Sequence, residues 1–144
     1  MRTSTPTPSD AGRVAIVVFE HRDDVGILRW LRPGFRHCFC LLSSPYGWLL
    51  CDPLKSGLCL DLLPSYDSFA LLAHYSAPGR HALLGCVGRL QPRPHLAIRP
   101  LTCVEVVKRA LGVEAPATLT PYQLHRKLIS TGDWLSAEVL SSGA

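Results

Sequence analysis

Charge is scarce in this 144-residue chain: 18% of the residues are charged, and the formal net charge is only +4. The basic residues are scattered without a dense run, so the charge pattern does not call for a nucleic-acid partner. The chain has no uninterrupted run of eighteen apolar residues, which argues against a membrane-spanning helix. The opening "MRTSTPTPSDAG" lacks the apolar stretch of a secretion signal. We therefore expect a cytoplasmic protein without a membrane span or a nucleic-acid ligand.

The cysteines also lack the spacing that is typical of metal sites. The chain has six cysteines but no C-x2-C pair. In the segment "HCFC", the alternation of a strand would send Cys38 and Cys40 to the face opposite His37, which disfavours a zinc site there. P-loop, G-x-G-x-x-G and G-x-S-x-G motifs are also absent. We expect no metal and no cofactor, and we expect the cysteines to be free thiols that are mostly buried on strands.

The apolar content of 47% predicts a single globular domain. Residues 1–12, rich in Ser, Thr and Pro, are expected to form a flexible N-terminal tail, and residues 13–144 the domain. The strands come before the last two helices, and two of them form an antiparallel hairpin around "SPYG", so the pattern is α+β with a mostly antiparallel sheet. Strands are predicted at 13–20, 35–44, 48–54, 57–64 and 81–90, helices at 65–76, 103–111 and 120–131, and a helical turn at 27–31.

The stretch "RPLTCVEVVKRALG" places one cysteine at the start of a predicted helix. Thr102 and Glu105 have the spacing of a T-x-x-E capping box, so the helix should begin at Cys103 and end before Gly112. In the first helical turn, unpaired N–H groups and the helix dipole favour a thiolate over a thiol. The alternative is that Cys103 is one more small buried apolar residue. A reactive role requires a base nearby.

Of the six histidines, His37 lies inside a strong strand pattern, on the same alternating face as Phe39 and Leu41. Asp52 follows fifteen positions later on the second strand of the hairpin, which should bring it within one or two rungs of His37. A carboxylate beside an imidazole fixes the ring tautomer, which the base of a cysteine nucleophile requires. The alternatives are a core histidine bonded to a backbone carbonyl and an aspartate that initiates the "DP" turn.

These segments together resemble a known family. The blocks "GFRHCFCL", "GWLLCDPL", "TCVEVVKRALGV" and "TPYQLHRKL" resemble the circularly permuted NlpC/P60 branch of the papain-like cysteine hydrolases, in which the histidine strand precedes the nucleophile helix. The resemblance spans residues 13–130. The blocks that start at Gly34 and Thr102 also resemble small proteins encoded among phage and prophage genes, so an association with phage is a further expectation.

The resemblance implies a papain-like fold, with an antiparallel sheet packed against the nucleophile helix. It implies that Cys103 is the nucleophile, His37 the general base and then acid, and Asp52 the group that orients His37. The expected reaction passes through a thioester on an amide, peptide or ester bond. The family's "D-C-S-G" is replaced here by "T-C-V-E", so murein specificity does not carry over.

Two alternatives to a hydrolase stay open. Permuted relatives include acyltransferases, so the acyl acceptor is not determined by the three residues. A non-enzymatic structural or assembly protein on the same fold is the second alternative. On the last predicted helix, His125 follows the cysteine as the base does in unpermuted enzymes, but we expect it to face solvent with Arg126 and Lys127 while Leu124 and Leu128 pack on the domain.

Overall fold

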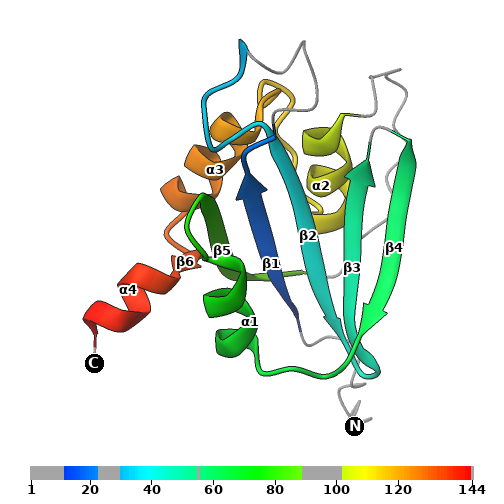
Figure 1. Cartoon of the computed structure of the whole chain (residues 1–144), viewed down its shortest axis with the longest axis vertical. Helices are drawn as coiled ribbons and strands as arrows, with labels where there is room; N and C mark the ends of the chain where they lie inside the picture. Colours follow the sequence, from blue (N-terminus) through cyan, green and yellow to red (C-terminus); the bar gives the residue numbers. More distant parts are fainter. Residues whose placement is uncertain (1–11, 23–29, 55, 89–101, 144) are drawn as a thin grey trace, which may run out of the picture.

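A computed structural model describes residues 12–22, 30–54, 56–88 and 102–143. In these ranges, six strands form one antiparallel sheet in the order β4-β3-β2-β1-β5-β6, accompanied by four helices (Figure 1). The predicted α+β class and antiparallel sheet are therefore confirmed. In chain order the elements are β1 (Arg13–Glu20), β2 (His37–Ser44), β3 (Gly47–Leu54), β4 (Gly57–Leu63), α1 (Ser68–Tyr75), β5 (Arg80–Val87), α2 (Cys103–Leu111), α3 (Pro121–Ser130), β6 (Leu135–Ser136) and α4 (Ala137–Ser142).

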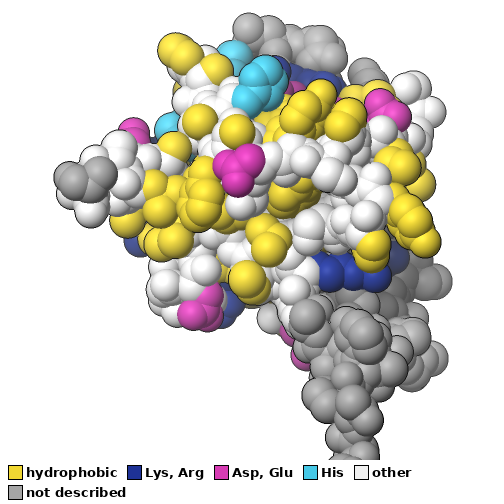
Figure 2. Space-filling model, turned by 90° about the horizontal axis from the view of Figure 1, so that it is seen from below, with side chains coloured by type: hydrophobic (Ala, Val, Ile, Leu, Met, Phe, Trp, Pro, Cys, Tyr) yellow, Lys and Arg dark blue, Asp and Glu magenta, His cyan; other side chains and the backbone are white. Residues whose placement is uncertain are grey.

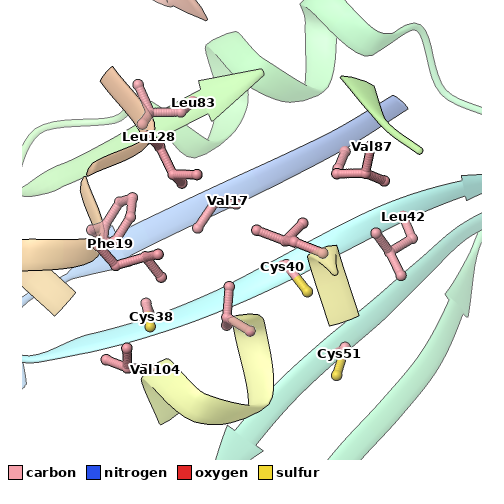
Figure 3. Close-up of a cluster of buried hydrophobic side chains, with 14 of the residues drawn as sticks. Val17, Phe19, Cys38, Cys40, Leu42, Cys51, Leu83, Val87, Val104 and Leu128 are labelled. Carbon is pink, nitrogen blue, oxygen red and sulfur yellow. The ribbon is translucent and has the colours of Figure 1, made fainter. Parts of the chain in front are cut away.

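Two hydrophobic layers cover opposite faces of the sheet, because alternate residues of each central strand point to opposite sides. On one face, Val17, Cys38 and Cys40 pack against apolar residues of α2 and α3 (Figure 3). On the other face, Val18 and Phe39 pack in a cluster that includes residues of α1. Helix α2 therefore lies directly on the central strands, and its first residue meets the end of the sheet where β2 begins.

The strand at the outer edge of the sheet, β4, is exposed on both faces. Its residues Leu58, Leu60 and Leu62 are each more than half exposed, and Figure 2 shows that apolar side chains reach the surface in several places. In the parts of the chain that the structure describes, no helix is both long and apolar enough to cross a bilayer.

Most predicted elements appear within two or three residues of their expected bounds. The short strand β6 and helix α4 were not predicted, because their apolar patterns are too short to indicate a strand or a helix. The helical turn expected at 27–31 and the tail at 1–12 fall almost wholly outside the described residues.

Helix α2 begins and ends where the sequence places it. The Thr102 hydroxyl accepts a hydrogen bond from the Glu105 N–H at 3.2 Å, and Gly112 ends the helix in the left-handed conformation with φ of 69°. The second half of the expected capping box is replaced by ion pairs, because the Glu105 carboxylate bonds Lys108 at 2.9 Å and Arg109 at 3.5 Å. The cap fixes Cys103 as the first helical residue.

The ammonium group of Lys108 ties α2 to the loop that follows it. Lys108 is buried, with 3% of its surface exposed. Its Nζ donates to the carbonyl oxygens of Ala115 at 3.0 Å and Thr118 at 2.9 Å, and it also pairs with Glu105. Three acceptors satisfy the three donors of the ammonium, which is what allows a lysine to be buried.

We expect Lys108→Met to lower the free energy of unfolding by about 3 kcal/mol, because it leaves the carbonyl oxygens of Ala115 and Thr118 without their donor and the Glu105 carboxylate with Arg109 alone. Arg109→Met is the matched control. Arg109 pairs with the same carboxylate, but its side chain is 40% exposed, so its loss should cost only about 0–1 kcal/mol. Urea denaturation of both variants measures the free energy of unfolding. Equal losses in the two variants would show that the buried contacts of Lys108 stabilise the fold no more than the exposed pair of Arg109.

Candidate active site

The hairpin of β2 and β3 joins His37 to Asp52. Its register pairs Ser44 with Gly47 next to the turn and Cys40 with Cys51 further along. Because Cys40 and Cys51 share one face, Asp52 and His37 share the other. Asp52 Oδ1 accepts a hydrogen bond from His37 Nε2 at 2.7 Å. The contact expected from the hairpin spacing is therefore present.

This pair is largely withdrawn from solvent. The His37 side chain is 5% exposed and that of Asp52 is 19% exposed. Because Nε2 is held by Asp52, the ring presents Nδ1 to its other neighbour, the side chain of Cys103. The imidazole is thus held between a carboxylate on the next strand and a thiol on a helix.

Cys103 approaches from helix α2. It is half-buried and packs against the core layer that contains Cys38. Its sulfur interacts with the thiol and the main chain of Cys38 and with the ring of His37. The register of β2 with β3 stops at Cys40, so His37 and Cys38 lie beyond its last pair, at the end of β2 where α2 begins. That placement lets one sulfur reach two consecutive residues that point to opposite faces.

The surroundings of Cys103 favour its thiolate. The hydrogen bond from the Cys38 thiol, followed by the hydrogen bond from His37 and the positive charge of its ring, lowers the pKa of Cys103 to about 5, although burial acts in the opposite direction. Burial pulls the pKa of His37 down, but the hydrogen bonds to Cys103 and Asp52 outweigh it and raise that pKa above its ordinary value. Both shifts favour a thiolate–imidazolium pair over a neutral thiol and imidazole.

The sequence did not identify Cys38 as a site residue and grouped it with the small apolar cysteines. In the structure its side chain interacts with that of Cys103, and burial together with that interaction raises the pKa of Cys38 well above its ordinary value. Cys38 therefore remains a neutral donor. The alternation of the strand predicts that Cys38 lies on the face opposite His37. Because α2 covers that face, this alternation was the sequence signal that could have identified Cys38 as a neighbour of Cys103.

The remaining cysteines differ in their exposure. All six are free, and Cys40 and Cys51 are buried as expected. Cys59 and Cys86, however, are exposed, so the expectation of buried strand cysteines is wrong for them. For Cys59 the reason is its position on β4, the edge strand, whose faces are not covered by a helix.

The expectation that His125 faces solvent is also wrong. Its ring packs edge-on against Phe19 with centroids 5.1 Å apart and tilts against Phe35 at 4.9 Å. Burial, together with the nearby His81, lowers the pKa of His125 to about 4, so the ring is neutral. The buried stripe of α3 runs through Pro121, Leu124 and Leu128, and position 125 lies four residues after Pro121 and three before Leu128, so it borders that stripe.

The described residues contain no group of three or more His, Cys, Asp or Glu side chains arranged to hold a metal ion. Comparisons of the chain with protein-family models, with curated proteins and with solved structures found no match. The chemistry of the site is therefore derived from its own geometry: a thiolate, an imidazolium that can deliver a proton, and a carboxylate that holds the imidazolium in place.

Proposed function

We propose that this protein is a cysteine hydrolase in which Cys103, His37 and Asp52 cleave an amide, peptide or ester bond through a thioester intermediate. The observation that carries the proposal is the position of His37. One ring nitrogen bonds Asp52 at 2.7 Å, and the same ring contacts a thiol whose pKa is about 5. This is the arrangement of nucleophile, base and orienting group that acyl transfer by cysteine needs.

In the first half of the reaction, the Cys103 thiolate attacks the carbonyl carbon of the substrate, and the carbonyl oxygen becomes an oxyanion. The His37 imidazolium then gives its Nδ1 proton to the leaving amine or alkoxide, which leaves a thioester on Cys103 and a neutral ring. In the second half, His37 takes a proton from water, the resulting hydroxide adds to the thioester, and the thiolate departs as the acid is released. Asp52 accepts from Nε2–H throughout and keeps the ring in the reactive tautomer.

Donors for the oxyanion are available at the start of α2. The first intrahelical hydrogen bond runs from the Val106 N–H to the Thr102 carbonyl, and the Glu105 N–H is bonded to the Thr102 hydroxyl. The N–H groups of Cys103 and Val104 come before both, at the end of the helix where donors lack intrahelical acceptors. Donors in that position, next to the nucleophile, stabilise the negative charge that develops in the transition state.

The order of these elements supports the permuted NlpC/P60 architecture as part of this proposal. The histidine strand β2 comes first, the aspartate strand β3 next, and the nucleophile helix α2 last, packed on the sheet. The same three residues would serve an acyltransferase, in which an amine or alcohol replaces water in the second half. We favour water because it is the acceptor that needs no further binding site.

A panel of acylating probes, such as p-nitrophenyl esters of increasing chain length, tests the proposal. We expect acylation of one residue, Cys103, to be trapped as a thioester that hydroxylamine cleaves. Cys103→Ala should abolish it, and Cys59→Ala, which removes an exposed thiol on the edge strand, should leave it unchanged. Equal slow labelling of the exposed thiols, unaffected by Cys103→Ala, would favour the alternative of a non-enzymatic assembly protein.

A further inference from the structure

Four of the six thiols lie on one face of the sheet, and they form two contacting pairs. Cys40 and Cys51 are opposite one another on β2 and β3, and their side chains interact. Cys38, one step along the same face of β2, belongs to the core cluster against which Cys103 of α2 packs, and the two side chains interact. Figure 3 shows Cys38, Cys40 and Cys51 beneath α2, with Val104, the residue next to Cys103, beside Cys38. The reactive cysteine therefore has a second thiol as its immediate neighbour.

The two members of the Cys103 and Cys38 pair differ in access. Cys103 is half-buried, whereas Cys38 is 0% exposed. Cys40 and Cys51, with exposures of 0% and 7%, are both shielded. An oxidant that enters the site therefore meets Cys103 first, and the nearest thiol to the product of that reaction is Cys38.

We propose that Cys103 and Cys38 form a peroxide-responsive dithiol, in which oxidised Cys103 is captured by Cys38 as a reversible disulfide. This second chemistry of the site goes beyond acyl transfer. It uses the same nucleophile but needs neither an acyl substrate nor the oxyanion donors. Its biological consequence is a reversible loss of the Cys103 nucleophile in place of irreversible oxidation.

The reaction balances with hydrogen peroxide or an organic hydroperoxide as the oxidant. The Cys103 thiolate attacks one peroxide oxygen, so that an S–O bond forms, the O–O bond breaks, and the departing hydroxide takes the His37 proton to become water. The Cys38 sulfur then attacks the sulfenic sulfur of Cys103. The S–S bond forms, the S–O bond breaks, and hydroxide leaves with the Cys38 proton as a second water. Two thiols lose two electrons in total, and the peroxide gains them.

The second step should be slower than the first. The Cys103 sulfur reacts as a thiolate, and thiolates are the nucleophilic form. Cys38 is buried and holds its proton, which slows its attack. Part of what holds that proton is the negative charge on Cys103, and this charge disappears when the sulfenic acid forms. A sulfenic acid should therefore appear briefly before the disulfide.

The experiment treats the reduced wild-type protein with about one equivalent of hydrogen peroxide, blocks the remaining thiols with N-ethylmaleimide, and maps the peptides by mass spectrometry. We expect a peptide cross-linked between Cys38 and Cys103, about 2 Da lighter than the two reduced peptides, which dithiothreitol separates. This map uses the unaltered chain and needs no hydrolytic activity. A missing cross-link therefore leaves the proposed hydrolase standing, and missing acylation leaves the dithiol standing.

Two variants sharpen the test. In Cys38→Ser, which keeps a hydroxyl donor beside Cys103 but cannot form the disulfide, dimedone should trap several-fold more sulfenic acid at Cys103, and excess peroxide should inactivate the thiol irreversibly. Cys51→Ser, the matched control from the neighbouring pair, should form the cross-link as the wild type does. Two results would overturn the proposal: a Cys40–Cys51 cross-link with Cys103 left unlinked, or sulfenic acid at Cys103 that lasts as long in the wild type as in Cys38→Ser.

Discussion

Replacing Asp52 with asparagine should slow turnover of the best acylating probe by about 10²- to 10⁴-fold while the protein stays folded. In the wild type, Asp52 can only accept, so Nε2 keeps its proton and Nδ1 is the nitrogen that gives and takes a proton. An asparagine of the same size can instead donate to Nε2, which favours the tautomer with the proton on Nδ1. That neutral tautomer cannot take a proton from the thiol or from water.

Asp61→Asn is the matched control for this variant. Asp61 lies on the neighbouring strand β4, where its carboxylate accepts a hydrogen bond from the Leu62 N–H, and it is exposed. Turnover should be unchanged in this variant. Thermal unfolding of both proteins separates an effect on chemistry from an effect on folding. Wild-type turnover in a folded Asp52→Asn protein would remove Asp52 from the mechanism.

The second large effect concerns the choice between two histidines. Replacing His37 with alanine should reduce the rate of Cys103 alkylation by iodoacetamide at pH 6 by about tenfold or more, because the thiolate loses its hydrogen bond from the ring and the ring's positive charge. The Cys38 donor remains in this variant, so some preference for the thiolate should persist. Peptide mapping of the alkylated protein measures the rate at Cys103 specifically.

His125→Ala should have the opposite profile. It removes ring contacts with Phe19 and Phe35 and should lower the thermal midpoint, but the alkylation rate of the folded protein should stay close to that of the wild type. The outcome that would reverse our assignment is a loss of Cys103 reactivity in His125→Ala together with normal reactivity in His37→Ala. The unpermuted order of catalytic residues would then have to be considered.

The sequence predicted well the parts of the site that depend on local chemistry. A threonine cap and a left-handed glycine define the ends of α2 from within a dozen residues, so the helical position of Cys103 could be predicted. The proximity of His37 and Asp52 required only a two-residue turn and the alternation of two strands. Both inferences depend on short stretches of chain, where the local sequence determines the structure without help from contacts to distant segments.

The features that escaped prediction depend on contacts between distant segments. Cys38 became a neighbour of Cys103 only because α2 packs on β2 with its first turn at the end of the strand. His125 is half-buried because Phe19 and Phe35, from the opposite half of the chain, pack against its ring. The exposure of Cys59 follows from the place of β4 at the edge of the sheet, which the strand pattern alone does not reveal.

The most direct test of the thiolate–imidazolium pair is the rate of Cys103 alkylation by iodoacetamide between pH 4 and pH 9, with the urea-unfolded chain as the reference. A depressed pKa means that the folded protein keeps the thiolate at neutral pH and loses it only as the pH falls through about 5. We therefore predict a half-maximal rate near pH 5 in the folded protein, against about 8.5 for an unperturbed thiol. A folded-state midpoint that coincides with that of the unfolded chain would contradict the account.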